Sequence, residues 1–382
     1  KHEYSDVEAH ELRLAFEDVS GQDMNWFFNQ WFFKAGHPNL DIQYDWDETT
    51  GTAVVTIEQT QDASNDVPYI FELPLKVDIY DAGGKARRES IRVTKRAQTF
   101  TFKTDTRPAL INVDAEKALL AVKHDNHTAE EWAFMYRHAP LFQDRWEAFE
   151  NLKQSDSELS AVIAQEALQD KHWSIRQAAI EIVDISQPEI QAKLAQLAEK
   201  DPEPAVRASA IRTLGATGEK SYVPIYQKSI QPDQAYSVLG AAMAALSNTD
   251  LDAALETAKN LEGDENPEIV VALAELYAAS PQADKLPWFR QRAKKIDNMA
   301  AFRFYELNIQ YLLGLDDNEA LEQAVNDFKA VSLDTNASLW RRFSNTKAIA
   351  DLRNFYAETA NKEKVDALNA VLKEIKEKEP NE

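Results

Sequence analysis

The chain has 382 residues, enough for two or three domains that each bury a core. Its 64 acidic and 42 basic residues give a formal net charge of -22, and basic pairs such as Arg87-Arg88 are short and isolated. This balance argues against nucleic-acid or anionic membrane partners, since both repel an acidic protein. The chain has no cysteine, which excludes disulfides and thiolate metal sites, and no apolar run reaches the roughly 18 residues of a membrane span.

Two helices are predicted within residues 1–38. Ser5 and Glu8 have the spacing of a capping box, and apolar residues recur at helical spacing over residues 12–19. A second helix follows and stops at residues 36–38, Gly-His-Pro, because glycine suits a helix end and proline cannot continue the ladder. A helical pair of about 38 residues is too small to bury a core of its own.

The second of these helices carries aromatic rings on every side. Residues 26–33 contain six rings in eight positions. Five side chains form one stripe at helical spacing, as expected for a core face: Met24, Phe27, Phe28, Trp31 and Phe32. Trp26 and Phe33 fall on the opposite side, where a surface helix normally carries charged residues. We therefore predict that the helix is covered from two directions and that one cover lies outside this chain.

From Leu40 the apolar period changes from helical to alternating. Residues 40–46 and 52–60 alternate across a short polar turn, which predicts a hairpin. Further strands are predicted within residues 69–81, 86–95, 98–104 and 109–114. About seven short strands at turn spacing predict an antiparallel β-sandwich over residues 39–124. Pro74 lies inside one strand and predicts an edge or a bulge there.

Residues 125–382 are predicted to be helical, with an internal repeat. Residues 170–183 and 201–214 align at an offset of 31, which superposes Asp170 on Asp201 and Arg176 on Arg207. A further shift of 32 aligns a third copy through Val238, Ala242 and Leu246. A fainter fourth copy follows at Val270 and Ala274. Such a period predicts an α-solenoid of stacked helix pairs. The spacing resembles HEAT repeats, in which the aspartate and arginine commonly bond between adjacent units.

Metal-binding patterns are incomplete in this sequence. A zinc peptidase helix needs two histidines one turn apart, with a glutamate beside the first. His10-Glu11 begins that pattern, but position 14 is Leu14. His124, His127 and Glu131 can be drawn as ligands, although the stretch favours a polar linker that leads into a helix capped by Thr128. We predict no metal-ligating and no catalytic residue in this chain.

Two other stretches invite a functional interpretation. Residues 215–221 resemble a phosphate loop, but the glycine spacing and the missing preceding strand favour a turn between repeat helices. Arg341 and Arg342 lie between Trp340 and Phe343, and we expect the two rings to anchor a helix while the guanidinium groups point elsewhere. Ion pairs on the surface or between repeats explain the arginines most simply. Recognition of a substrate carboxylate is the alternative.

Residues 12–42 resemble the end of the catalytic domain of zinc aminopeptidases of the aminopeptidase N (gluzincin) type. The family pattern runs from a phenylalanine through Ser/Thr-Gly to an aromatic helix, and ends at a Gly-x-Pro step into a β-sandwich. It is matched here by Phe16, Ser20, Gly21, Asp23, Met24, Phe27, Phe28 and Trp31, with Gly36 and Pro38 at the step. The order that follows, a sandwich and then HEAT-like helices, is also the family's order, and residues 136–152 look like the opening of that helical domain.

The resemblance implies that the chain is the noncatalytic C-terminal portion of such an enzyme. Family members carry their zinc ligands and catalytic residues upstream, so the parent would hold zinc and cleave peptides, while this chain would hold none. Trp26 and Phe33 would then face the missing N-terminal catalytic domain. A first residue other than methionine, Lys1, fits a piece of a longer protein. In the family the helical domain closes over the active site, and some members use basic residues there to bind the peptide's carboxylate end, for which Arg341 and Arg342 are candidates.

A second hypothesis is a protein-interaction scaffold. In that case the concave face of the solenoid would bind partners and no peptidase would be involved. The aminopeptidase fold also occurs in noncatalytic versions, so the resemblance alone does not separate the two hypotheses. An intact His-Glu-x-x-His motif in the coding sequence upstream of Lys1 would favour the enzyme.

Overall fold

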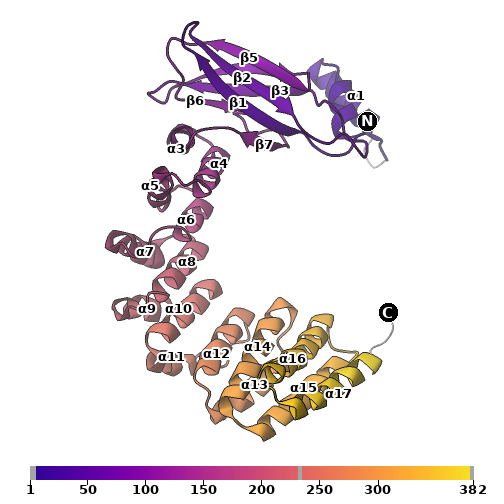
Figure 1. The fold of residues 1–382 in the computed structure, drawn as a ribbon, viewed down its shortest axis with the longest axis vertical. Coiled ribbons are helices and arrows are strands. Elements are labelled where there is room, and N and C mark those ends of the chain that lie inside the picture. Colours follow the sequence, from indigo (N-terminus) through magenta and orange to yellow (C-terminus); the bar gives the residue numbers. More distant parts are fainter. Residues whose placement is uncertain (1–5, 231–234, 379–382) are drawn as a thin grey trace. The chain divides into compact units, whose positions relative to one another are not determined.

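The computed structural model describes residues 6–230 and 235–378. The chain divides into two compact units, residues 1–167 and residues 168–382. The first holds a helical pair, a β-sandwich and three helices, and the second is a stack of helices (Figure 1). The fold class predicted from the sequence is confirmed: a short helical segment, a sandwich, and then HEAT-like helices.

Helix α1 spans Ala9–Ser20 and α2 spans Asn25–Trp31. Glu8 caps α1 in a capping box with Glu11, while Ser5, the cap expected from the sequence, lies outside the described residues. Gly21 ends α1 with φ 67°, a left-handed conformation that glycine adopts without strain. Helix α2 ends at Trp31, so Phe32 and Phe33 follow it instead of extending its face.

The described residues contain seven strands in two facing sheets. Their bounds are β1 (Asn39–Asp47), β2 (Thr52–Gln59), β3 (Leu73–Tyr80), β4 (Ala86–Val93), β5 (Ala97–Lys103), β6 (Leu110–Val113) and β7 (Val122–Asp125). The strand order is β5-β2-β1-β7 in one sheet and β4-β3-β6 in the other. The predicted hairpin is confirmed, because β1 pairs with β2 antiparallel from Leu40 opposite Gln59 to Asp47 opposite Thr52.

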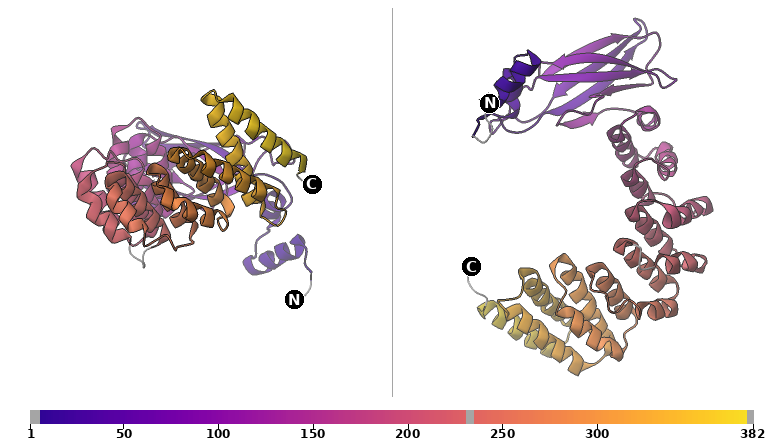
Figure 2. Two further views of the ribbon diagram at one scale, coloured as in Figure 1. Left: turned by 90° about the horizontal axis from the view of Figure 1, so that it is seen from below. Right: turned by 180° about the vertical axis from the view of Figure 1, so that it is seen from behind.

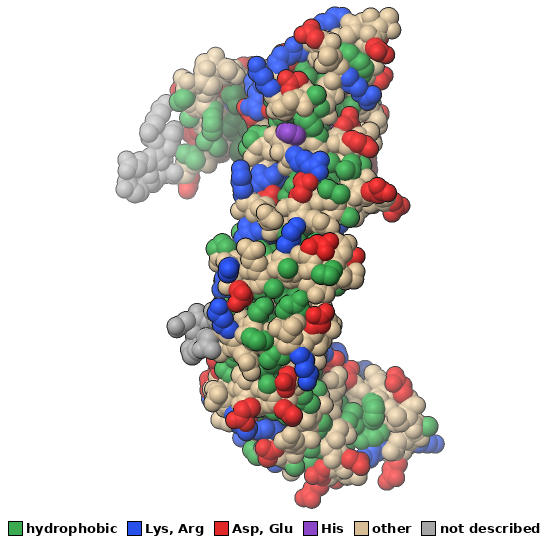
Figure 3. All heavy atoms as spheres, turned by 90° about the vertical axis from the view of Figure 1, so that its left-hand side faces the viewer, with side chains coloured by type: hydrophobic (Ala, Val, Ile, Leu, Met, Phe, Trp, Pro, Cys, Tyr) green, Lys and Arg blue, Asp and Glu red, His purple; other side chains and the backbone are tan. Residues whose placement is uncertain are grey.

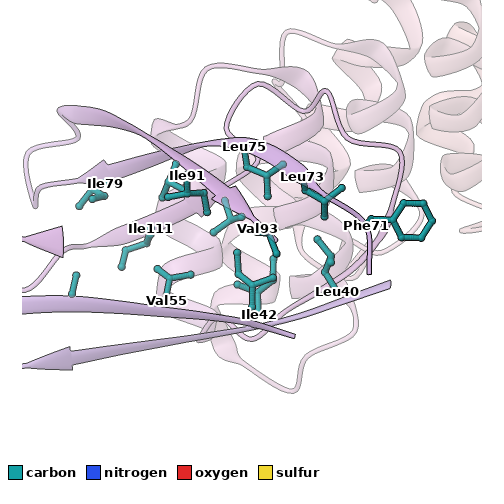
Figure 4. Close-up of a cluster of buried hydrophobic side chains, with 14 residues drawn as sticks. Leu40, Ile42, Val55, Phe71, Leu73, Leu75, Ile79, Ile91, Val93 and Ile111 are labelled. Atoms are coloured by element: carbon teal, nitrogen blue, oxygen red, sulfur yellow. The ribbon is translucent and has the colours of Figure 1, made fainter. Parts of the chain in front are cut away.

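The core of the sandwich lies between the two sheets, where alternate residues of each strand meet (Figure 4). Its buried members are Leu40, Ile42, Ala53, Val55, Ile57, Phe71, Leu73, Leu75, Val77, Ile79, Ile91, Val93, Ile111 and Val113. Most are β-branched or leucine, which pack well on a pleated surface. Phe71 extends this core toward α2, where its ring lies 5.2 Å from that of Trp31.

Two details of the sheets differ from the expectation. Strand β7 was not among the predicted strands and extends into the stretch that was expected to be a linker, and it pairs parallel to β1, from Val122 opposite Asn39 to Asp125 opposite Ile42. Pro74 lies in β3, the middle strand of its sheet. Strand β6 pairs with β3 only over Val77–Tyr80, so Pro74 lies in the half of β3 that β6 does not reach, where its missing N–H is tolerated.

Three helices complete the first unit: α3 (Ala129–His138), α4 (Phe142–Lys153) and α5 (Glu158–Ala167). Thr128 caps α3 as predicted, accepting a bond from the N–H of Glu131. A buried charge network joins α4 to the sandwich. Lys117 Nζ lies 2.7 Å from Glu147 and 3.2 Å from Asp144, and Asn112 donates to Asp144 at 2.8 Å.

The second unit stacks helices in two layers (Figure 2). One layer contains α6 (Trp173–Ile180), α8 (Pro204–Gly215), α10 (Tyr236–Thr249), α12 (Pro267–Ala279), α14 (Asn298–Leu315) and α16 (Leu339–Glu358). The other helices are α7 (Pro188–Lys200), α9 (Val223–Ser229), α11 (Leu251–Ala258), α13 (Leu286–Ala293), α15 (Asn318–Leu333) and α17 (Lys362–Lys378), with 3-10 turns at Lys220–Tyr222 and Ala283–Lys285. Within the described ranges no helix combines the length and apolar composition of a membrane span.

The repeat read from the sequence is confirmed by burial and by hydrogen bonds. The repeated apolar positions are at most 2% exposed: Val206, Ala210, Leu214, Val238, Ala242, Leu246, Val270 and Ala274. Arg176 makes two 2.7 Å bonds to the carboxylate of Asp201 in the next repeat. Its remaining nitrogen donates to the carbonyl of Asp170, and Arg207 repeats that bond on the carbonyl of Asp201. The two repeats that contain α6 and α8 are therefore joined by a buried bidentate ion pair.

Candidate docking surface

Helix α1 has none of its twelve residues buried, although it carries several large apolar side chains. Phe16 is 52% exposed and Val19 is 90% exposed, and Leu12 and Leu14 are also exposed. A surface helix usually buries its apolar stripe against the rest of the protein. We define the docking surface as these exposed side chains together with Phe32 and Phe33, which follow α2 and are about half exposed.

Helix α2, which carries part of the docking surface at its C-terminal end, is bound to the sandwich by hydrogen bonds. The side-chain amide of Gln30 donates to the carbonyl of Glu72 at 2.9 Å and accepts from the N–H of Glu72 at 2.8 Å. It thus pairs with the backbone as a neighbouring strand would. Phe28 is 1% exposed and stacks on Phe32, with ring centroids 4.4 Å apart.

Helix α1 is held to α2 by polar contacts near the turn between them. The carboxylate of Glu17 accepts from the N–H of Met24 at 3.0 Å and from Arg13 at 2.7 Å. The ring of Phe16 lies 6.4 Å from that of Phe28 and is the aromatic contact between the two helices. These contacts fix the direction of α1 while leaving its apolar stripe in solvent.

Trp26 and Phe33, which were expected to face a missing domain together, have different surroundings in the structure. Phe33 is 51% exposed and belongs to the docking surface. Trp26 is half-buried, and the guanidinium of Arg92 in β4 lies 4.9 Å from its ring centroid in a cation–π contact. Part of the cover expected from outside is therefore supplied by the sandwich. The core stripe expected on α2 also divides, since Phe28 is buried and Phe32 is exposed.

The apolar residues of α1 are the part of this surface that the sequence interpretation missed. Leu12, Phe16 and Val19 have ordinary helical spacing, so they predict a core stripe. Periodicity gives the face of a helix that is apolar, but not whether a partner lies within the same chain. The signal available was the length of the segment, which is too short to bury two such stripes.

Arg341 and Arg342 both lie in the first turn of α16 and are half-buried. Arg341 lies beside Tyr305 of α14, and its Nε is buried with no hydrogen-bond partner in the described chain. Arg342 points toward α15, with its Nε 3.4 Å from the carbonyl of Ser332. The neighbouring rings were expected to anchor the helix, but Trp340 and Phe343 are exposed. That expectation is wrong, because the buried face of α16 carries Asn345, Ala348 and Leu352 instead.

The residues present do not fit a zinc site. His124 is exposed on β7, whereas the His127 ring lies between Tyr44 and Trp132, with centroids 4.2 and 4.7 Å away. Over residues 6–230 and 235–378, no group of three or more His, Cys, Asp or Glu side chains could hold a metal ion. Residues 215–221 form the end of α8 and the turn before α9, as expected for a connection between repeat helices. On the face drawn in Figure 3, basic and acidic side chains are interspersed along the helices.

Comparisons with known proteins agree with this architecture. Residues 36–114 match a domain of unknown function with an Ig-like fold (DUF3458), and residues 160–247 and 190–279 match HEAT repeats. No curated protein matches the chain.

Solved structures similar to the chain include an aminopeptidase and a lyase complex. The crystal structure of Legionella pneumophila aminopeptidase A in complex with aspartic acid matches with a TM-score of 0.52 and 11% identity, covering 97% of this chain and 52% of that one. The CpcE–CpcF complex of phycocyanin lyase from Nostoc matches with a TM-score of 0.34 and 15% identity, over 58% of this chain and 97% of that one, which is too weak to argue from. The chain therefore spans about half the length of the Legionella aminopeptidase and shares its fold over that half.

Proposed function

We propose that this chain is the noncatalytic C-terminal portion of a zinc-dependent aminopeptidase of the gluzincin type, which hydrolyses N-terminal residues from peptides. In this proposal residues 1–38 are the helical end of the catalytic domain, residues 39–124 are a supporting sandwich, and residues 125–382 are a solenoid that shapes or closes substrate access. The parent enzyme would hold zinc upstream of this chain.

The observation that carries the proposal is the exposed apolar stripe of α1. Burying a phenylalanine or leucine side chain is worth roughly 1.5–3 kcal/mol, so a helix that leaves two leucines and Phe16 about half exposed and Val19 almost fully exposed loses about twice that amount. An apolar surface of this kind marks an interaction site. It lies in the segment whose pattern resembles the end of the aminopeptidase catalytic domain, and the Legionella aminopeptidase extends for about as much again as the matched half.

The experiment compares this chain with the product of the complete coding sequence. We expect the complete product to cleave N-terminal residues from peptides and to bind about one zinc ion, whereas residues 1–382 alone should show neither property. Peptide cleavage with stoichiometric zinc in the purified chain would contradict the proposal. A complete product without a His-Glu-x-x-His motif, and without peptidase activity, would contradict it as well.

Arg341 and Arg342 stay candidates for binding the peptide's carboxylate. They point to different neighbours, Tyr305 and Ser332, so they do not form one bidentate clamp. In the complete enzyme, Arg342→Ala should raise the KM for peptides with a free C-terminus and leave that for C-terminally amidated peptides unchanged. Equal effects on both substrates would remove Arg342 as a carboxylate ligand.

The scaffold hypothesis rests on a different surface. Apolar side chains at the start of α14 and α16 are exposed, namely Met299, Leu339, Trp340 and Phe343, and the ring of Phe302 lies 6.2 Å from that of Trp340. A solenoid that binds proteins offers surfaces of this kind. The upstream sequence separates the two hypotheses, since a scaffold needs no zinc motif.

A further inference from the structure

A groove of about 240 Å³ lies between α15 and α17, with α16 contributing to its floor (Figure 1). Polar contacts join α15 and α17 at both ends of the groove. At one end, Lys364 of α17 donates to the side-chain oxygen of Asn318 in α15. At the other end, the Nζ of Lys329 in α15 lies 2.5 Å from the carboxylate of Glu374 in α17. The groove lies wholly within the second unit, and binding there would not depend on the proposed function.

The floor of the groove is apolar. Its side chains are Leu321 and Val325 of α15, Leu352 of α16, and Ala367, Leu368 and Val371 of α17. Sites for drug-sized ligands have volumes of roughly 300–1,000 Å³, so this groove is slightly too small for such molecules. It fits a ligand with a single aliphatic or aromatic group.

Lys364 brings a positive charge to the wall of the groove formed by α17. The side chain is partly exposed, and its Nζ donates to Asn318 and, at 3.1 Å, to the hydroxyl of Tyr356 in the groove floor. The Nζ also lies 4.8 Å from the centroid of the Tyr356 ring, which holds the ammonium group by a cation–π contact. Both hydrogen bonds go to neutral acceptors, and no ion pair within residues 6–230 and 235–378 includes Lys364. Since an ammonium group has three N–H donors, one remains for a ligand, and the O–H of Tyr356 is a second donor beside it.

Glu322 brings a negative charge to the opposite wall, formed by α15. It lies one helical turn after Asn318 and is exposed, and its carboxylate has no ion-pair partner among the described residues. Asn326, one turn further along α15, is the remaining polar residue of the lining and is exposed as well. Its side-chain amide can donate to a ligand or accept from one. The groove therefore combines an apolar floor with one unpaired cation and one unpaired anion.

These two charges discriminate against ligands that carry a single charge. A simple carboxylate would pair with Lys364 but be repelled by Glu322, and a simple amine would have the opposite conflict. A free α-amino acid carries an ammonium and a carboxylate group on one carbon atom. It can therefore bond to both walls while its side chain covers the floor.

We propose that the groove between α15 and α17 binds a free α-amino acid with a large apolar side chain, such as leucine. Its carboxylate accepts from Lys364, and its ammonium group donates to Glu322. Its side chain packs on the leucines and valines of the floor. Each of the three features is recognised by a different part of the lining, so each can be removed alone.

The test titrates the whole chain with L-leucine and follows binding by saturation-transfer difference NMR, which detects millimolar affinities. The compound 4-methylpentanoate is leucine without its amine, 3-methylbutylamine is leucine without its carboxylate, and glycine lacks the side chain. We expect each of these three probes to bind at least about tenfold more weakly than leucine, because each loses one of the three contacts. Failure of leucine to bind at millimolar concentration, as a direct ion pair between Lys364 and Glu322 would cause, would overturn the proposal. Equal affinities for leucine and any of the three probes would also overturn it.

Variants assign each contact. Lys364→Met should bring leucine and 3-methylbutylamine to the same affinity, whereas Glu322→Gln should do so for leucine and 4-methylpentanoate. Lys376→Met and Glu358→Gln are the matched controls, since both positions are exposed and outside the groove lining, and they should keep the tenfold differences. A difference that persists in the corresponding groove variant would place leucine elsewhere and overturn the proposal. Circular dichroism checks that the variants fold, and the comparison of probes on the unmodified chain does not depend on any variant.

Discussion

At the scale of single residues, the ion pair between Arg176 and Asp201 is the clearest link between sequence and structure. The two residues are spaced by the repeat, and both are at least 90% buried. A buried pair is stable only when both charges are paired and hydrogen-bonded, which the bidentate geometry provides. The pair therefore fixes the distance and angle between neighbouring repeats.

Arg176→Ala should lower the free energy of unfolding by about 3 kcal/mol, because it leaves the Asp201 carboxylate buried without its partner. Urea unfolding followed by circular dichroism measures this loss. Lys347→Ala is the matched control, since Lys347 pairs with Asp351 on an exposed helix face and should cost less than about 0.5 kcal/mol. Equal losses for the two variants would show that the repeat pair is not a structural link.

Asp125 gives the first unit a predictable response to acid. Burial alone would raise its pKa, but the ammonium of Lys123 and His127, together with a 2.5 Å bond from the Tyr44 hydroxyl, hold the pKa of this carboxyl below its ordinary value of 3.8. A carboxyl with a lowered folded-state pKa stabilises the fold above its unfolded pKa and loses that contribution as the pH falls through the folded one. The loss should therefore begin below about pH 5.

Asp125→Asn should make the free energy of unfolding less dependent on pH below that point, measured by urea titrations from pH 6 to pH 3. Tyr44→Phe keeps the carboxylate and removes one bond, so it should retain more of the pH dependence than Asp125→Asn does. Identical pH profiles for the unmodified chain and for Asp125→Asn would contradict the assigned role.

The sequence predicted the residues of the repeat, but not those of the charge network between α4 and the sandwich. Asp170, Arg176, Asp201 and Arg207 recur at a fixed spacing, so their role is visible in the sequence. Lys117, Lys123, Asp144 and Glu147 have no such spacing, because they meet only when α4 folds against the sandwich. Strand β7 was missed for the same reason, since Val122 and the three polar residues after it become a strand only by pairing with β1.

At the scale of elements, helix packing in the solenoid depends on close approach at one glycine. Gly215 ends α8, and a Cβ placed there would overlap the Cβ of Ala245 in α10. The sequence showed this glycine only as part of a turn.

Gly215→Ala should cost about 1–3 kcal/mol of unfolding free energy, because α8 and α10 would have to separate. Gly263→Ala is the control, since no atom lies within 4 Å of the added Cβ, and it should be close to neutral. Thermal unfolding of the two variants compares them, and a neutral Gly215→Ala would contradict the packing described.

The helical pair α1–α2 shows where periodicity is sufficient and where it is not. The aromatic run predicted a helix covered from two sides, and α2 does lie against the sandwich through Trp31 and Gln30. The position of the uncovered face was predicted only in part. Phe16 and Phe33 are exposed, whereas the guanidinium of Arg92 in β4 covers Trp26.

Phe16→Ser combined with Phe33→Ser should reduce self-association of the chain in sedimentation velocity and reduce the fluorescence of bound ANS. The unfolding free energy should fall by about 1.5–3 kcal/mol, because each ring is about half buried and Phe16 contacts Phe28. Phe28→Ala should also lower stability, since Phe28 is buried between the helices. Unchanged self-association in the double variant would show that the docking surface does not mediate self-association of the chain.

At the scale of the whole molecule, the order of helical pair, sandwich and HEAT-like helices could be predicted because each part has its own period. The three-part division at residues 38 and 124 stays a prediction. The boundary between the two compact units falls after residue 167, because α3, α4 and α5 belong to the same unit as the sandwich. What no period could show is that the apolar side chains of α1 are left exposed in this chain.

The account predicts that these apolar side chains are covered in the complete gene product. Hydrogen–deuterium exchange over residues 9–33 measures the cover directly, in residues 1–382 alone and in the complete product. We expect exchange in α1 to slow at least tenfold in the complete product, with the solenoid as an internal reference. Equal exchange of α1 in the two samples would contradict the claim that a catalytic domain packs on this surface.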